Sequence, residues 1–102
     1  DTVLVKAPSR FPDTYRDIAM LMSSATPSAA IVECIKSVKS DKLISVEIFD
    51  LYTGDKVPDG QKSIAVRVRY GSFEKTLTDE EVNKVHQKIV NGLISNMNII
   101  LR

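Results

Sequence analysis

Residues 47–70, EIFDLYTGDKVPDGQKSIAVRVRY, contain two apolar-rich runs joined by a polar loop. The second run, residues 61–71, alternates large apolar side chains with small or basic ones, which is the period of a half-buried strand. The loop at residues 53–60 contains Gly, Pro and Asp-Gly, which are typical of turns. Residues 42–52, KLISVEIFDLY, are rich in β-branched and aromatic residues and predict the partner strand. The stretch therefore predicts a β-hairpin.

The segment before the hairpin predicts a strand followed by a helix. Residues 15–22, YRDIAMLM, alternate in the manner of a strand. Thr26 is a favourable N-cap and Pro27 a favourable first helical residue, so we expect the helix to begin there. Its inward stripe is expected to consist of Ile31, Cys34, Ile35 and Val38. Cys34 is accordingly interpreted as an inert buried thiol.

The segment after the hairpin predicts a second helix and a short last strand. Thr78 followed three residues later by Glu81 forms a capping-box pattern, which explains the acidic TDEE run better than a metal site does. The apolar stripe of this helix consists of Val82, Val85, Ile89 and Leu93. His86 lies beside that stripe and is given a structural or exposed role. Residues 98–102, NIILR, predict the strand.

The order of these elements is strand, helix, strand, strand, helix, strand. With right-handed crossovers, this order predicts an α+β ferredoxin-like fold, in which a four-stranded antiparallel sheet carries both helices on one face. We expect residues 11–102 to form this domain. Residues 1–10 are expected to be an extended lead-in from a preceding domain, with room for a short edge strand at TVLVK.

Composition excludes several classes of function. The 102 residues include one Cys and one His, which excludes an internal disulfide and sites built from several thiolates or histidines. The net charge of +1 lacks the clear basic excess of most nucleic-acid binders, so any such role must come from how charge is arranged. No apolar run approaches the roughly 18 to 20 residues of a membrane span, and we expect a cytoplasmic protein with no membrane partner.

The predicted sheet has a face without helices, and the strand at residues 42–52 poses a conflict there. Ile44, Val46 and Ile48 share their parity with Asp50 and Tyr52, so the two sets cannot simply face opposite sides. A β-bulge near Ile48 or Phe49 would resolve the conflict. The bulge is expected to bury Phe49 and Leu51 and to turn Asp50 and Tyr52 outward.

The polar residues near the loop are expected to cluster on this face. Counting back from the loop places position 52 opposite about 61 and position 50 opposite about 63. Asp50, Tyr52 and Ser63 would then lie together, with Ala19 and Ala65 as a low floor. An aromatic ring, a carboxylate, a hydroxyl and small residues suit an unpaired nucleobase, which stacks on rings and is read along its edges. The phosphates could be held by Arg16, Lys62, Arg67 and Arg69.

Four separated motifs resemble a known family when they are taken together. They are RFP…YRDIAM, IFDLYTG…GQKSIAVRVRY, TLTDEEV and the terminal LR, and they cover residues 8–102. This combination resembles the ferredoxin-fold anticodon-binding domain that closes the β subunit of bacterial phenylalanyl-tRNA synthetase. The resemblance implies that the open sheet face contacts the anticodon stem-loop of phenylalanine tRNA.

The resemblance also implies roles for individual residues. Tyr52 would be the stacking ring, Asp50 would accept a hydrogen bond from a base edge, and Ser63 would donate or accept beside it. Ala19 would allow close approach of the base. Arg67 and Arg69 match the family less tightly, and a phosphate-binding role is expected for them.

The parent protein implied by the resemblance is an α2β2 enzyme. In such an enzyme, aminoacylation with ATP and magnesium takes place on the α subunit, and the present domain is non-catalytic. No cofactor is therefore expected in this domain, and DNA is not expected as a partner.

Other functions remain open on the sequence alone. Acylphosphatases share the fold, but their Gly-rich phosphate loop is not found here. A regulatory domain that binds a small ligand, as ACT domains do, is a further alternative. An RNA-recognition motif would carry an aromatic-rich third strand, which SIAVRVRY lacks on its outward side. Asp50 and Tyr52 could also simply end an edge strand, and Arg67 and Arg69 could form a solvated face.

Overall fold

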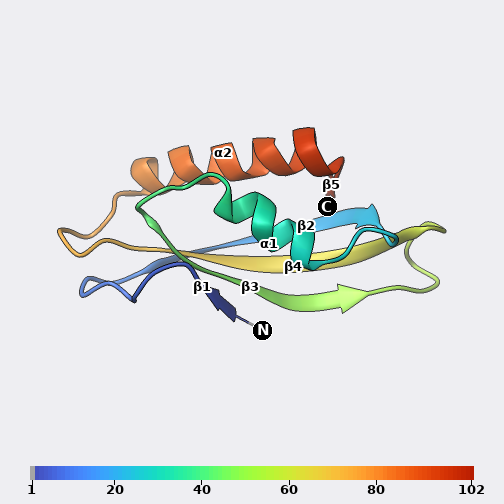
Figure 1. Cartoon of the computed structure of the whole chain (residues 1–102), viewed down its shortest axis with the longest axis horizontal. Helices are drawn as coiled ribbons and strands as arrows, with labels where there is room; N and C mark the ends of the chain where they lie inside the picture. The colour runs from blue at the N-terminus through green and yellow to red at the C-terminus, as the bar shows by residue number, and fades with distance from the viewer. Residues whose placement is uncertain (1) are drawn as a thin grey trace.

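The computed structural model describes residues 2–102 as one antiparallel sheet with two helices. Both helices lie on the same side of the sheet (Figure 1). The elements in chain order are β1 (Thr2–Leu4), β2 (Thr14–Ser23), α1 (Ala29–Lys36), β3 (Leu43–Tyr52), β4 (Gln61–Tyr70), α2 (Asp79–Met97) and β5 (Ile100–Leu101).

The ferredoxin-like arrangement is confirmed, but the sheet has five strands and the prediction of four was wrong. The strand order is β1-β3-β4-β2-β5, in which the last four positions are the predicted set. The added strand, β1, pairs with the outer edge of β3, where Thr2 lies opposite Glu47 and Leu4 opposite Ser45. An edge strand offers unpaired backbone donors and acceptors, and β1 covers that edge of β3 along Ser45, Val46 and Glu47.

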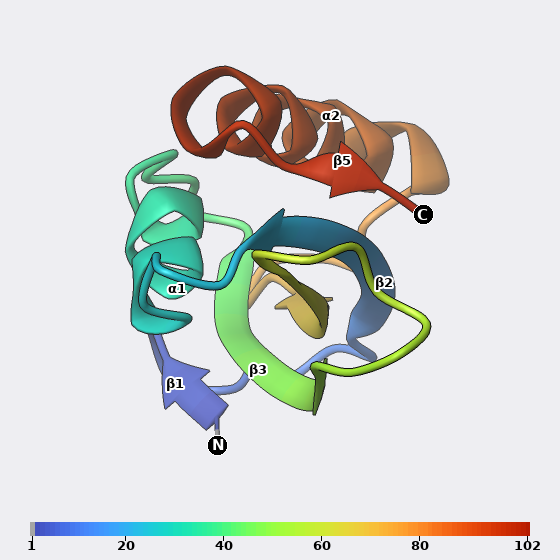
Figure 2. The ribbon, with the colours of Figure 1, turned by 90° about the vertical axis from the view of Figure 1, so that its right-hand side faces the viewer.

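Figure 2 shows the two helices beside the sheet, and the side chains buried between these elements form the core. Alternate residues of β4 are buried on this side, as the period of two requires. Helix α2 contributes the stripe that the sequence predicts. In α1 the prediction holds for Ile31 and Ile35, whereas Cys34 is only half-buried and Val38 lies beyond the end of the helix, partly buried at the margin of the core. The fully buried side chains include Met20, Ile31, Ile35, Val46, Ile64, Val66, Val68, Tyr70, Val82 and Leu93.

Helix α1 begins later than the Thr26–Pro27 signal predicts. Its N-cap is Ser28, and the preceding residues form a tighter turn in which Ala30 N–H donates to the Pro27 carbonyl at 3.0 Å. Lys62 stabilises this turn, because its Nζ donates to the Thr26 carbonyl at 2.6 Å and to Ser28 Oγ at 3.0 Å. These bonds hold the carbonyl of Thr26 toward the sheet rather than in a helix cap.

The capping box at the start of α2 is confirmed. Glu81 N–H donates to Thr78 Oγ1 at 3.2 Å, and Thr78 N–H donates to Glu81 Oε1 at 3.0 Å. A hydrogen bond from Lys75 and the one from the Thr78 backbone lower the pKa of Glu81 to about 2. The acidic run therefore serves the positive end of the helix.

His86 has a structural contact on the inner side of α2, as expected. The Tyr70 hydroxyl and His86 Nδ1 lie 2.9 Å apart, and the two rings meet edge to face. Burial raises the pKa of Tyr70 above its usual range, so its hydroxyl stays protonated and can donate to the neutral imidazole.

Lowering the pH through the titration of His86 is expected to destabilise the fold. Burial and, to a smaller extent, the Arg16 charge hold the pKa of His86 below its ordinary value of 6.5. The unfolded chain therefore binds more protons than the folded one as pH falls below 6.5. The free energy of unfolding should decrease there by at most about 1.4 kcal/mol per pH unit. Urea unfolding at a series of pH values between about 7.5 and 5.5 measures this slope.

The variant His86→Gln is the control for this pH dependence, because it removes the titrating group. Its free energy of unfolding should change less with pH over the same interval. Equal slopes in the two proteins would assign the dependence to other groups.

Candidate nucleic-acid interface

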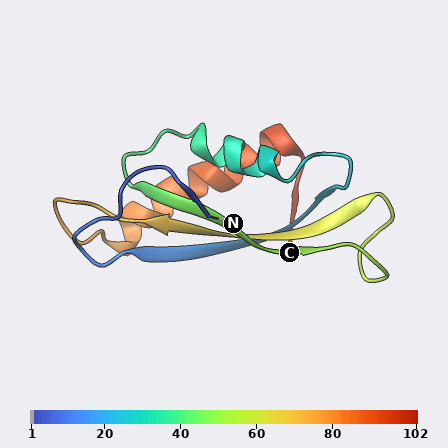
Figure 3. The ribbon, with the colours of Figure 1, turned by 60° about the horizontal axis from the view of Figure 1, so that its bottom comes forward.

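The side of the sheet away from the helices, called the open face here, carries no helix (Figure 3). Along β4 the side chains that point to this face are partly exposed, in alternation with buried ones. Their predicted orientation is confirmed. They are Ser63, Ala65, Arg67 and Arg69.

The predicted β-bulge in β3 is confirmed. The register between β3 and β4 shifts between Ile48 and Asp50, which leaves Phe49 out of the pairing. The shift places Asp50 opposite Ala65 and Tyr52 opposite Ser63. Both therefore share the side of the open-face residues of β4.

The pairing positions expected for this hairpin were wrong by two residues. Tyr52 lies opposite Ser63 rather than residue 61, because Gln61 stands beyond the last pair with β3 and pairs only with β2. For the same reason Asp50 lies opposite Ala65 rather than Ser63. The loop that closes the hairpin is thus longer than the count assumed.

The expectation that the bulge buries Phe49 and Leu51 was also wrong. Phe49 is 45% exposed and its ring lies under the Arg67 guanidinium, whose Cζ is 4.8 Å from the ring centroid. Leu51 lies opposite the buried Ile64 but is 54% exposed. The C-terminal end of β3 projects past the N-terminal end of α1, so the helix does not cover it (Figure 1).

The structure brings together the four residues expected to contact a base. Ala19, Ala65 and Asp50 form one row across β2, β4 and β3, and Tyr52 and Ser63 form the next row. The two alanines leave a low floor beside the Asp50 carboxylate and the Tyr52 ring, which is 44% exposed. The arrangement can receive a flat, polar-edged ligand.

Arg102 joins this group, and sequence reasoning missed it as a site residue. Its backbone N–H donates to the Ala19 carbonyl at 3.0 Å, and its Nη1 donates to Ser63 Oγ at 2.6 Å. Ser63 lies opposite Leu21, one row away from Ala19, so the Arg102 side chain reaches it diagonally across β2. The position of Arg102 follows from the pairing of β5 with β2, which brings the C-terminal residue beside Ala19.

The absence of a side chain at Gly54 leaves space for the Tyr52 ring. A Cβ added at Gly54 would lie 2.8 Å from the Tyr52 hydroxyl oxygen and 3.1 Å from Cζ. The φ of Gly54, +148°, also belongs to a region that side chains other than glycine rarely adopt. The turn after β3 therefore depends on glycine for two reasons.

Arg67 and Arg69 lie on the open face, but both are paired with carboxylates. Arg67 donates two hydrogen bonds to Asp17, from Nε to Oδ1 at 2.8 Å and from Nη2 to Oδ2 at 3.0 Å. Arg69 Nε donates to Asp13 Oδ2 at 2.6 Å. The bond from Arg67 lowers the pKa of Asp17, and Asp17 in turn raises the pKa of Arg67. These guanidinium charges are largely neutralised within the sheet.

The structure places Arg16 and Lys62 on the helix side of β2 and β4, whereas the phosphate contacts were expected on the open face. Arg16 shares its parity with Ile18 and lies on the helix side, where its Nη2 bonds to Asn83 Oδ1 at 3.3 Å. Lys62 shares its parity with Ile64 and is only 8% exposed. Lys62 is therefore held inside the fold, while Arg16 bonds to α2 and also borders the hollow beside Tyr15 and Asp17.

Residues 2–102 contain neither a metal-binding cluster nor a membrane-spanning helix. No group of three or more His, Cys, Asp or Glu side chains within them is placed to hold a metal ion. Neither helix in this part of the chain has the length and apolar composition required to cross a membrane.

The fold and the open face define a class of protein, the ferredoxin-like domains that leave one sheet face free for a ligand. Comparison with known families is more specific. The family model for the ferredoxin-fold anticodon binding domain matches residues 9–102, and the chain belongs to this family.

Curated relatives agree with this assignment. The chain is 52% identical over 102 residues to a protein of Geobacter metallireducens named phenylalanine–tRNA ligase beta subunit, covering 100% of the chain and 13% of the relative. The proteins of the same name from Geobacter sulfurreducens and Staphylococcus saprophyticus are 53% and 44% identical, over 96% and 84% of the chain and 12% and 11% of the relatives. The chain thus spans about an eighth of the length of these relatives. Family membership favours RNA binding over the acylphosphatase-like and small-ligand alternatives.

Proposed function

We propose that this chain is the tRNA anticodon-binding domain of a phenylalanine–tRNA ligase β subunit. The observation that carries the proposal is the group on the open face, in which an exposed ring, a carboxylate and a hydroxyl surround an alanine floor. It recognises the anticodon stem-loop of phenylalanine tRNA, whose unpaired bases can be splayed onto this face.

The proposed contacts follow from the chemistry of each side chain. Tyr52 stacks on a base, and Asp50 accepts a hydrogen bond from a donor on the base edge. Ser63 accepts from Arg102, which has donors only, so the Ser63 hydroxyl hydrogen is free to donate to the base. Ala19 lets the base approach the sheet closely. Arg67 and Arg69 complete the RNA-facing surface.

Aminoacylation would take place in another part of the parent protein, on the α subunit. As a β subunit it would assemble with an α subunit into an α2β2 synthetase that uses ATP and magnesium in the cytoplasm. The present domain would contribute tRNA recognition and no catalytic residue.

Binding of two RNA hairpins to the chain tests the proposal. One hairpin is the anticodon stem-loop of phenylalanine tRNA, and the other has the same stem with a changed anticodon. We expect tighter binding of the first, measured by fluorescence anisotropy at about 50 and 200 mM salt. Because Arg67 and Arg69 are already paired, one phosphate contact through Arg102 is expected, and the affinity should fall only roughly threefold between the two salts.

Two results would contradict the proposal. Equal binding to both hairpins with a steep fall in salt would show that phosphate contacts alone act in this chain. Absence of binding at both salt concentrations would reject RNA recognition by the open face.

A further inference from the structure

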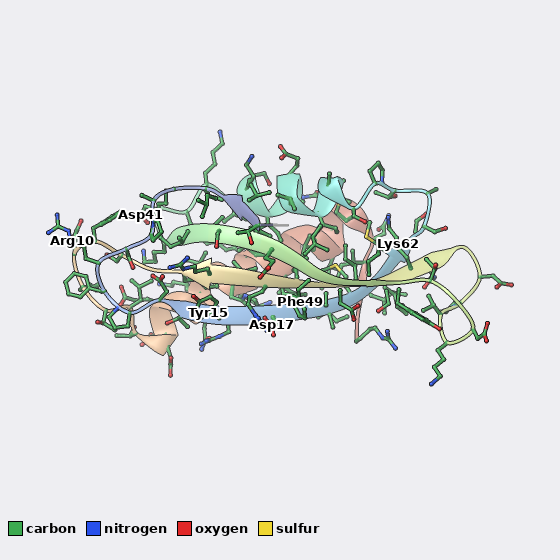
Figure 4. All side chains as sticks on the ribbon, turned by 90° about the horizontal axis from the view of Figure 1, so that it is seen from below. Arg10, Tyr15, Asp17, Asp41, Phe49 and Lys62 are labelled. Carbon is green, nitrogen blue, oxygen red and sulfur yellow. The ribbon has the colours of Figure 1, made fainter. Side chains whose placement is uncertain are left out.

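The open face carries a second group of exposed aromatic rings, apart from the site formed by Ala19, Asp50, Tyr52 and Ser63. Tyr15 on β2 is 53% exposed, and Phe49 in the bulge of β3 is 45% exposed. Figure 4 shows Tyr15, Asp17 and Phe49 along the underside of the sheet. Exposed aromatic side chains on a bare sheet face are one means by which proteins bind single-stranded nucleic acid.

A hollow lies beside these rings. Its volume is about 610 Å³, and it is lined by Tyr15, Arg16, Asp17, Glu47 and Arg67. This volume is in the range of sites for small organic ligands, roughly 300 to 1,000 Å³. The hollow therefore has room for a nucleobase.

Arg67 is held in this hollow as a rigid plane. Two bonds to Asp17 fix the orientation of its guanidinium, and the Phe49 ring supports it at 4.8 Å. The Asp17 carboxylate also cancels its charge. A fixed, neutralised guanidinium plane is suited to stacking on a base and poorly suited to holding a phosphate.

We propose that a second nucleobase of the bound RNA occupies this hollow, between the Tyr15 ring and the Arg67 plane. The inference rests on the proposed RNA-binding function and adds a site to it. Glu47 can accept a hydrogen bond from an exocyclic amino group of that base. Ser63 and Arg67 are four residues apart on β4, about 13 Å along the strand, so one RNA loop can reach both sites.

Variants with single changes in the hollow test the inference. Tyr15→Ala should weaken binding of the anticodon stem-loop of phenylalanine tRNA roughly 5- to 150-fold, and Tyr15→Phe should restore it. Arg67→Lys keeps the charge but loses the plane, so it should also weaken binding several-fold. Phe73→Ala is the matched control, because Phe73 is 47% exposed and lies outside the strands.

A fluorescent base locates the contact. 2-Aminopurine replaces each loop base in turn, and its fluorescence is quenched where it stacks on an aromatic ring. We expect quenching at one loop position for the Tyr52 site and at a different loop position for the Tyr15 site. Tyr15→Ala should relieve the quenching at one loop position, and Tyr52→Ala should relieve it at another. Circular dichroism melting of each variant verifies that it folds.

The outcomes separate this inference from the proposed function. If Tyr52→Ala weakens binding while Tyr15→Ala and Arg67→Lys match the original chain, the second site is rejected and the proposed function stands. Unchanged binding in Arg67→Lys alone would reject the stacking role of Arg67. A chain that binds neither hairpin overturns both proposals.

Discussion

Replacing Tyr52 by alanine is expected to weaken binding of the phenylalanine-tRNA anticodon stem-loop by roughly 5- to 150-fold. The ring is 44% exposed on the open face, opposite Ser63 and next to the row that holds Asp50. Its removal deletes the stacking surface but leaves the floor and the polar groups in place. Discrimination between the two anticodons should decline with it, because the base is no longer held in register with Asp50. Fluorescence anisotropy titrations of both hairpins measure the two effects.

Tyr52→Phe is the matched control, since it keeps the ring and removes only the hydroxyl. It should retain most of the affinity. The stability of Tyr52→Ala should be close to that of the original chain, because the side chain is not part of the core. Unchanged RNA binding by a folded Tyr52→Ala variant would exclude this ring from recognition.

The largest effect on stability is expected from Ile64→Ala, at about 2 to 5 kcal/mol. Ile64 is fully buried in β4, where it pairs with Met20 of β2, and the two helices cover the sheet on its side. Shortening it leaves a cavity that neighbouring side chains fill only in part. For a domain of this size the melting temperature should fall by roughly 10 to 30 °C. Thermal and urea unfolding followed by circular dichroism measure the change.

Two variants bracket that result. Ile64→Val removes a single methyl group and should cost about 0.5 to 1.5 kcal/mol. Leu51→Ala removes the cross-strand neighbour of Ile64, but Leu51 is 54% exposed, so its loss should be within about 0.5 kcal/mol of zero. A Leu51→Ala loss as large as that of Ile64→Ala would mean that this end of β3 is covered in solution.

The main elements could be predicted because their patterns are local. The alternation in β4 determines which residues are buried, and the Thr78–Glu81 box determines where α2 begins. The parity conflict in β3 predicted a bulge correctly, since the hydrophobic and polar requirements of that strand were both visible in the sequence.

The details of the candidate site depended on contacts between distant residues. The bulge leaves Phe49 unpaired and its ring lies against the guanidinium of Arg67 in the neighbouring strand, a contact that the sequence of β3 alone does not reveal. The sequence suggested that Lys62 is a surface cation. In the structure its ammonium group instead donates hydrogen bonds to the Thr26 carbonyl and the Ser28 hydroxyl inside the fold. Arg102 reached the site through the pairing of β5 with β2.

The ion pairs that tie Arg67 to Asp17 and Arg69 to Asp13 have a kinetic consequence. Carboxylates on the same face cancel these two charges, so the face projects little positive potential into the solvent. Steered association reaches about 10⁸ to 10⁹ M⁻¹s⁻¹, whereas unsteered protein encounters proceed at about 10⁵ to 10⁶ M⁻¹s⁻¹. RNA should therefore meet this face at an unsteered rate. Cognate and non-cognate molecules would then be separated by how long each stays bound.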